Sequence, residues 1–176
     1  TTEYQIQNRG MSMGEFQFIY WWEWGHRFLG RVIGLVFAVP FAIFWWRGMI
    51  PARLKWPLIG LFALGGLQGA IGWWMVSSGL VDRLDVSQYR LATHLGMAFV
   101  ILGVSIWIAL QARYGVSARA PHRSAPLAAI FWGLVFVQIV LGAFVAGLDA
   151  GRIYTTWPLM EGRVIPDGYL DRKSVV

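Results

Sequence analysis

The sequence predicts an all-α, polytopic transmembrane four-helix bundle, on the basis of composition, span length and charge placement. Of the 176 residues, 57% are hydrophobic and only 14% are charged, well below the roughly 25% charged residues of soluble domains. Four apolar stretches are each long enough to cross the roughly 30 Å hydrocarbon layer of a bilayer, namely residues 28–46, 56–77, 91–110 and 126–148. We therefore expect a membrane-embedded protein without a soluble domain.

The chain divides into three parts by composition. We expect an outer-face N-terminal segment that includes the start of the first helix (1–25), a transmembrane four-helix region (26–148) and an outer-face loop and tail (149–176). The polar and aromatic opening segment must cross the membrane, and no apolar stretch before it would carry it across, so a further helix is expected upstream. The charged stretch at residues 171–173 likewise indicates an internal piece of a longer membrane protein.

Lysine and arginine determine the predicted orientation. The connections at residues 47–55 and 112–125 each carry three basic residues and no acid, whereas residues 79–90 and the tail after Leu148 balance acids against bases. The positive-inside rule puts the two basic connections in the cytoplasm and both ends of the chain on the periplasmic side of a bacterial inner membrane. The net charge of +6 then reflects topology and contact with anionic membrane lipid, and we expect no nucleic-acid partner. The absence of cysteine excludes disulfide and thiolate chemistry by this chain.

Two polar spacings predict where helices begin. Ser12 and Glu15 have the spacing of a capping box, so the first helix is expected to begin near Met13 and to extend beyond the bilayer. Asp85 and Gln88 repeat this spacing before the third span. A helix starting there would place position 94 about nine residues along, or roughly 13 Å at 1.5 Å per residue.

Two histidines are the strongest indication of function. His26 and His94 lie near the starts of separate helices that run in the same direction, so both reach the outer leaflet. Two neutral imidazoles at matching depth are what axial ligation of one haem iron requires. A lone intramembrane histidine more often packs or relays protons, and the pair is what favours a metal site. His122 lies in the basic connection beside Pro121 and is interpreted as a solvated group.

Glycines follow the first histidine along one helix face. Gly30 and Gly34 lie four and eight residues after His26, which leaves a groove without side chains below the imidazole. A flat macrocycle would fit against such a backbone, so both glycines are candidate cofactor-binding residues. The alternative is a seam of small residues at which two helices pack.

Three charged residues accompany the histidines. Arg90 lies one turn outward from His94, and Arg27 follows His26 directly. Each guanidinium could bind a haem propionate through paired hydrogen bonds, or could extend to lipid phosphate. Glu23 precedes His26 by three residues and is the candidate catalytic residue, because a partly buried carboxylate can accept a proton or stabilise developing positive charge. Its alternative role is an ion pair with Arg27.

The sequence pattern Gln-x-x-x-Gly occurs twice. Gln68 and Gly72 in the second span have the same spacing as Gln138 and Gly142 in the fourth. The match fits an internal duplication, although five residues are weak support for one. Glutamines within a membrane more often bond across helices than contact a substrate.

Four longer motifs carry a family resemblance. They are WEWGHRFLGR (22–31), GGLQGAIGWWM (65–75), YRLATHL (89–95) and AGLDAGRIYTTWPLM (146–160). Together they closely resemble haem A synthase in its alphaproteobacterial and mitochondrial form, and the resemblance covers essentially the whole chain. The resemblance implies eight transmembrane helices in two pseudo-symmetric halves, of which this chain matches helices two to five.

The resemblance also implies a reaction. Members oxidise a methyl group of haem O to the formyl group of haem A for cytochrome oxidase biogenesis, with a haem b as cofactor and haem O and haem A as substrate and product. By this resemblance His26 and His94 are the axial metal ligands of the N-terminal half, and Glu23 is the acidic residue tied to activity. Haem O synthase and cytochrome oxidase assembly factors are the implied protein partners, and a homo-oligomer is possible.

Two other functions stay open from the residues alone. A bis-histidine membrane cytochrome b would transfer electrons from quinol without turning over a substrate, and two coordinated histidines leave no open iron position, which favours this alternative. However, both visible ligands lie on one membrane face, whereas such cytochromes usually place haems at both. A structural helper or transporter fragment would instead use the histidines for packing or proton relay.

Overall fold

The computed structural model describes residues 9–77, 86–115, 123–148, 150–153, 155–156, 158–160 and 162–164. Four long helices account for most of these residues: α2 (Met13–Trp46), α3 (Ala52–Ser77), α4 (Gln88–Tyr114) and α5 (Ala125–Gly147). A single turn, α6 (Ala150–Ile153), follows α5. Each long helix is long and apolar enough to cross a membrane, which confirms the predicted all-α transmembrane fold.

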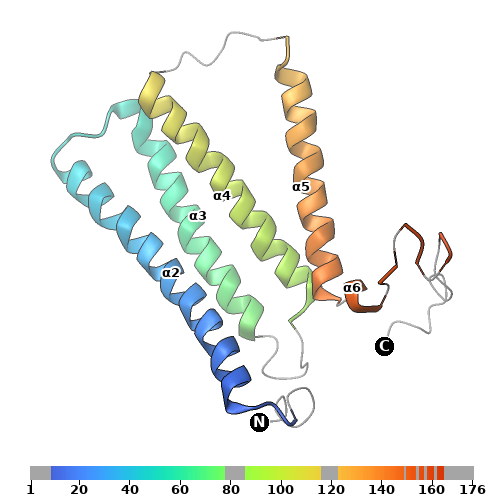
Figure 1. Ribbon diagram of the computed structural model, residues 1–176. Helices are drawn as coiled ribbons and strands as arrows, with labels where there is room; N and C mark the ends of the chain where they lie inside the picture. The colour runs from blue at the N-terminus through green and yellow to red at the C-terminus, as the bar shows by residue number, and fades with distance from the viewer. Residues whose placement is uncertain are drawn as a thin grey trace.

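The four helices lie side by side in an antiparallel row (Figure 1). In the described part of the chain, α4 packs extensively against both α3 and α5, while α2 contacts α3 only over a short length and does not contact α4. Figure 1 shows the start of α2, the end of α3, the start of α4 and the end of α5 at one end of the row. That end therefore carries the starts of the two helices that hold His26 and His94.

Local sequence explains where the helices begin and end. The Ser12 hydroxyl accepts from the Glu15 backbone, and the Glu15 carboxylate accepts from the Ser12 backbone, so the predicted capping box and the start of α2 are confirmed. Helix α4 ends at Gly115, whose φ of 64° is the left-handed conformation that glycine adopts at low cost. Helix α4 begins later than the second spacing predicts, at Gln88 with Ser87 as its N-cap and without a side-chain cap, and Asp85 lies outside the described residues.

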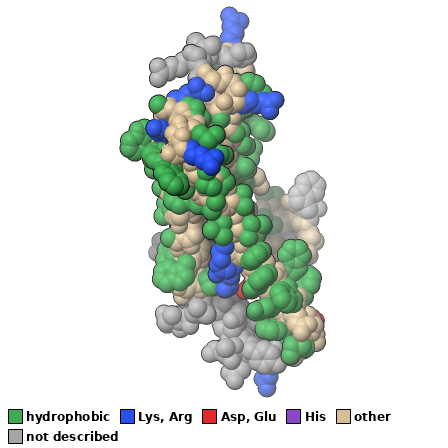
Figure 2. Space-filling view, turned by 90° about the vertical axis from the view of Figure 1, so that its left-hand side faces the viewer, with side chains coloured by type: hydrophobic (Ala, Val, Ile, Leu, Met, Phe, Trp, Pro, Cys, Tyr) green, Lys and Arg blue, Asp and Glu red, His purple; other side chains and the backbone are tan. Residues whose placement is uncertain are grey.

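The surface is apolar because lipid is its solvent. Among the described residues only five hydrophobic side chains are buried: Ile50, Leu54, Ala92, Ile108 and Ala143. Large apolar side chains cover the helix exteriors, as the space-filling view shows, and lysine and arginine gather near one end of the row (Figure 2). Such a surface suits contact with lipid hydrocarbon. In that environment helices are favoured because their backbone polar groups bond within the helix.

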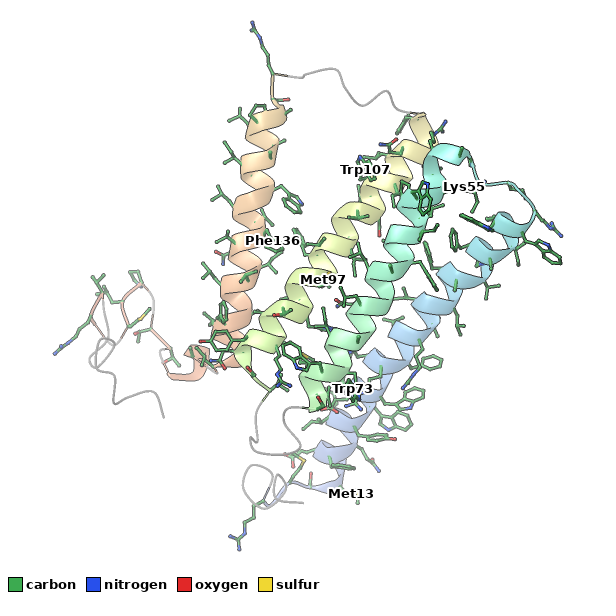
Figure 3. The ribbon with its side chains drawn as sticks, turned by 180° about the vertical axis from the view of Figure 1, so that it is seen from behind. Met13, Lys55, Trp73, Met97, Trp107 and Phe136 are labelled. Carbon is green, nitrogen blue, oxygen red and sulfur yellow. The ribbon has the colours of Figure 1, made fainter. Side chains whose placement is uncertain are left out.

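Aromatic contacts connect neighbouring helices. Phe62 of α3 lies 6.1 Å from Phe37 and 6.2 Å from Phe41 of α2 between ring centroids, and this cluster is the main link between the two helices. On the other side of the row, the ring centroid of Phe136 of α5 lies 6.2 Å from that of Phe99 of α4, with the rings tilted by 36°, and Figure 3 shows Phe136 directed from α5 toward α4. The contact between α2 and α3 is therefore small, whereas α4 and α5 make extensive contact, although they spread apart toward the end of α4 and the start of α5 (Figure 1).

Candidate functional site

His94 is held by the neighbouring helix α3. The side-chain amide nitrogen of Gln68 donates to the main-chain carbonyl of His94 at 3.1 Å and lies 3.4 Å from the ring Nε2 of the same residue. The ring Nδ1 and the Gln68 carbonyl oxygen Oε1 are buried and have no hydrogen-bond partner among the described residues. One polar residue thus fixes both the backbone and the ring of the predicted ligand.

Glycine at position 72 makes room for this ring. A Cβ atom built on Gly72 would lie only 2.9 Å from the imidazole Cε1 of His94. Real Cβ atoms essentially never come so close, so any side chain at this position would displace the ring. Gly72 therefore forms the backbone cradle against which the His94 imidazole lies. Its neighbour Trp73 lies near the end of α3, at the same end of the row as Met13 at the start of α2 (Figure 3).

The helix faces next to His26 are open. His26 is exposed, and a Cβ built on Gly30 or Gly34 of α2 would meet no atom within 4 Å. A Cβ on Gly66 or Gly69 of α3 would likewise meet no atom within 4 Å. These two glycines lie four and seven residues after Phe62, on the part of α3 nearer to His94. The phenylalanine cluster of Phe37, Phe41 and Phe62 joins α2 to α3, and beyond it both helices present glycine to the space between them. The face of α2 below His26 is therefore free of contacts at both glycines, and the groove for a macrocycle stays a prediction.

His26 and His94 lie near the starts of α2 and α4, at the same end of the row, and the backbones of these two helices do not contact each other. The start of α4 at Gln88 places His94 six residues along the helix, roughly 9 Å at 1.5 Å per residue, so the predicted depth of roughly 13 Å is too large. His122 lies outside the described residues.

Arg90 bonds to the end of α3. Its Nη1 donates to the carbonyl of Trp74 at 2.7 Å, and its guanidinium carbon lies 4.3 Å from the centroid of the Trp74 ring. The last carbonyls of a helix lack partners within the helix, so the arginine satisfies one of them and stabilises the negative end of the helix dipole. The sequence suggested a bond to a haem propionate or to lipid phosphate, and this contact with Trp74 is neither of these. It places the positive charge of Arg90 one turn outward from His94.

Glu23 and Arg27 form the ion pair that the sequence offered as an alternative. Arg27 Nη2 lies 3.2 Å from Glu23 Oε2, and the two side chains are 52% and 62% exposed, respectively. An exposed pair of this kind contributes little to stability, at most about 1 kcal/mol. The pair leaves the carboxylate accessible on the same helix as His26, one turn nearer the start.

Two partners of the site escaped prediction from sequence. The sequence predicts for Gln68 only a bond across helices, without its partner, and does not single out Trp74, yet these two residues hold His94 and Arg90. The available signal was the intramembrane glutamine itself, because such a side chain needs a partner on a neighbouring helix. Which helix would supply that partner depends on how α3 and α4 pack.

The residues present fit a bis-histidine haem. The described residues hold no group of three or more histidine, cysteine, aspartate or glutamate side chains suited to a bare metal ion. They do hold two imidazoles near the starts of two helices that run in the same direction, with open glycine positions below one ring and Gly72 against the other. Two histidines are a ligand set that haem iron accepts, and backbone without side chains leaves room for a flat macrocycle.

Comparison with known proteins agrees with this chemistry. The COX15-CtaA family profile, described as cytochrome oxidase assembly protein, matches residues 1–174. Proteins called "Heme A synthase" are similar to the chain: that of Maricaulis maris is 70% identical over 97% of this chain and 50% of its own length. Those of Hyphomonas neptunium and Parvibaculum lavamentivorans are 55% identical (97% and 49%) and 57% identical (94% and 48%), respectively. No solved structure gives a significant match.

The chain spans about half the length of the curated relatives that it matches. The match nevertheless runs through every helix described above, including the segments that carry both histidines, Glu23 and Gln68. The resemblance noted from the four sequence motifs is confirmed. The chain belongs to the COX15-CtaA family of cytochrome oxidase assembly proteins.

Proposed function

We propose that the protein acts as a haem A synthase, an oxidoreductase that converts the methyl substituent of haem O to the formyl group of haem A. The observation that carries this proposal is the position of His26 and His94 at one end of the row, near the starts of two helices that run in the same direction, with open glycine positions on α2 below His26. The family and the curated relatives called heme A synthase support it. None of the relatives described above is called an electron-transfer cytochrome, so the alternative function has no support from them.

In this proposal His26 and His94 would be the residues that hold the haem iron. Gly30, Gly34 and Gly72 leave room beside the two rings, as any side chain at Gly72 would displace His94. When bound, an iron porphyrin supplies the oxidising chemistry that an unactivated methyl group requires. Whether haem O or a resident haem b occupies this pair of ligands, the chain contributes the ligands and their spacing.

Glu23 is proposed to handle protons at the site. Its carboxylate lies one turn from His26 on α2 and is exposed, so it can accept a proton at Oε1 or Oε2 or face developing positive charge on a bound substrate. The ion pair with Arg27 orients the carboxylate along the helix. Arg90, fixed on Trp74, places a second positive charge at the outer end, where it would attract a propionate.

We further propose that this site faces the periplasm. The basic residues of the α2–α3 connection and of the end of α4 would then lie in the cytoplasm, as the positive-inside rule requires. Haem O synthase and cytochrome oxidase assembly factors are the proposed partners, since they would supply the substrate and receive the product.

Pigment analysis tests the proposal. The protein would be produced in membranes that also contain a haem O synthase, purified in detergent, and its haems extracted and separated. We expect haem O and haem A in the wild-type extract, and haem O without haem A when the protein is omitted from the same membranes. Purified protein that carries haem b alone under these conditions, with no haem A in the membranes, would contradict the enzymatic proposal.

A further inference from the structure

Gln68 is the polar side chain that contacts His94, and it does so through its amide nitrogen, while its amide oxygen has no partner among the described residues. Its amide nitrogen reaches both the His94 carbonyl, at 3.1 Å, and the ring Nε2, at 3.4 Å. An amide nitrogen carries two hydrogens and can only donate, so one hydrogen is available for each of these acceptors. The carbonyl contact is the firmer of the two and fixes the amide in place.

This donor constrains the proton on the imidazole ring. A neutral imidazole carries one hydrogen, and the nitrogen that accepts a hydrogen bond must be the one without it. Because the Gln68 amide donates toward Nε2, the ring proton belongs on Nδ1, which has no hydrogen-bond partner among the described residues. No second described contact competes with Gln68 for the choice of tautomer.

We infer that Gln68 is a positioning residue that keeps His94 of the haem-free protein in the Nδ1-protonated tautomer, in which the unprotonated Nε2 accepts from the Gln68 amide. Gly72 is the second part of this arrangement, because only a residue without a side chain lets the ring lie where the amide can reach it. The inference deepens the proposed haem site and rests on it for its purpose: the nitrogen kept free of a proton is Nε2, and an iron bound there would take the place of the Gln68 amide. The tautomer itself is a property of the haem-free protein.

Nitrogen NMR of the haem-free protein tests the inference directly. The chain has three histidines, so labelling with ¹⁵N-histidine gives few signals, and those of His94 are the ones absent from His94→Ala. At a pH where the ring is neutral, we expect wild-type Nε2 to give the signal of an unprotonated nitrogen and Nδ1 that of a protonated one. A wild-type protein with the proton on Nε2 would overturn the inference.

The variant Gln68→Met removes the donor at nearly constant volume. Since no other described group then selects a tautomer, we expect the single-tautomer pattern of His94 to be lost and replaced by a mixture. Gln138→Met is the matched control, because Gln138 in α5 precedes Gly142 by four residues, as Gln68 precedes Gly72, and is exposed. An unchanged His94 pattern in Gln68→Met would show that Gln68 does not set the tautomer.

Gly72→Ala provides an independent variant if Gln68→Met fails to give the helical circular dichroism of the wild type. The new Cβ would lie 2.9 Å from Cε1 and push the ring away from the amide, so the same loss of the single tautomer is expected. Gly142→Ala is its control, since a Cβ there meets nothing within 4 Å. A retained single tautomer in Gly72→Ala would contradict the inference. Absence of bound haem in a protein that shows the expected tautomers would instead contradict the proposed function alone.

Discussion

His26 and His94 are both histidines, but they lie in different surroundings. His94 is partly buried, bonded by Gln68 and pressed against Gly72, whereas His26 is exposed on a helix face that presents glycine. A buried, oriented ring loses little freedom on binding a ligand, while an exposed ring on a loosely held helix loses more. We infer that His94 is the preorganised ligand of the pair and that His26 completes the site.

Replacing His94 by alanine tests the ligand role. We expect His94→Ala to lose most of the bound haem, because the site retains one imidazole and a cavity at Gly72. The measurement is the ratio of haem absorbance to protein in the purified sample. His122→Ala, in the basic connection, is the control and should keep the wild-type ratio. Full haem occupancy in His94→Ala would remove this residue from the site.

Glu23→Gln separates charge from shape. The amide keeps the size of the side chain but cannot take up a proton as the carboxylate does, so we expect haem content near wild type and conversion of haem O reduced by about 10²- to 10⁴-fold. Extracted haem A per unit of protein is the readout. Glu15→Gln is the matched control, because Glu15 acts in the capping box rather than near a histidine. Wild-type conversion by Glu23→Gln would exclude a catalytic role.

At the scale of elements, the helices are held with unequal strength. Helix α4 packs extensively against both α3 and α5, while α2 is joined to α3 through the phenylalanine cluster and the contact of Lys55 with the Trp45 ring. The open glycine faces lie on the weakly packed side. A site that must admit a large planar molecule benefits from this arrangement, because little helix contact has to be broken to enter it.

Close approach of α4 and α5 depends on one glycine. A Cβ on Gly147 would lie 2.8 Å from the main-chain Cα of Gln88, and backbone cannot move aside as a flexible side chain can. We expect Gly147→Ala to destabilise the helix pair by about 1–3 kcal/mol, the usual effect of overpacking. The midpoint of unfolding in a mixed-detergent titration measures it. Gly133→Ala, where a Cβ meets nothing within 4 Å, should leave the midpoint nearly unchanged; equal midpoints for both variants would show that the contact is unimportant.

At the scale of the whole molecule, orientation decides which compartment the histidines face. The chain has no cysteine, so single cysteines can be introduced as reporters without a background. We expect Met13→Cys, on an exposed position at the start of α2, to react in intact cells with a reagent that does not cross the inner membrane. Ala52→Cys, exposed at the start of α3, should react only after the membrane is made permeable. The opposite pattern would place the site in the cytoplasm.

Much of the fold follows from sequence because its causes are local. Apolar length predicted four spans, and the observed helices cover all of them except Leu148, each beginning earlier than its span. The capping box predicted the start of α2 correctly, since its hydrogen bonds join residues three apart. The second spacing failed because α4 begins at Gln88 with no side-chain cap, and this moved His94 nearer the helix start.

The sequence by itself determined the membrane fold, the family and the two histidines, because hydropathy, motif identity and residue type are all written along the chain. Only the tertiary structure decided what holds those histidines: the bond from Gln68, the cradle at Gly72 and the attachment of Arg90 to Trp74. Each of these joins residues on different helices. Such contacts depend on the rotation and spacing of neighbouring helices, which are set by packing of many side chains together and not by any local pattern.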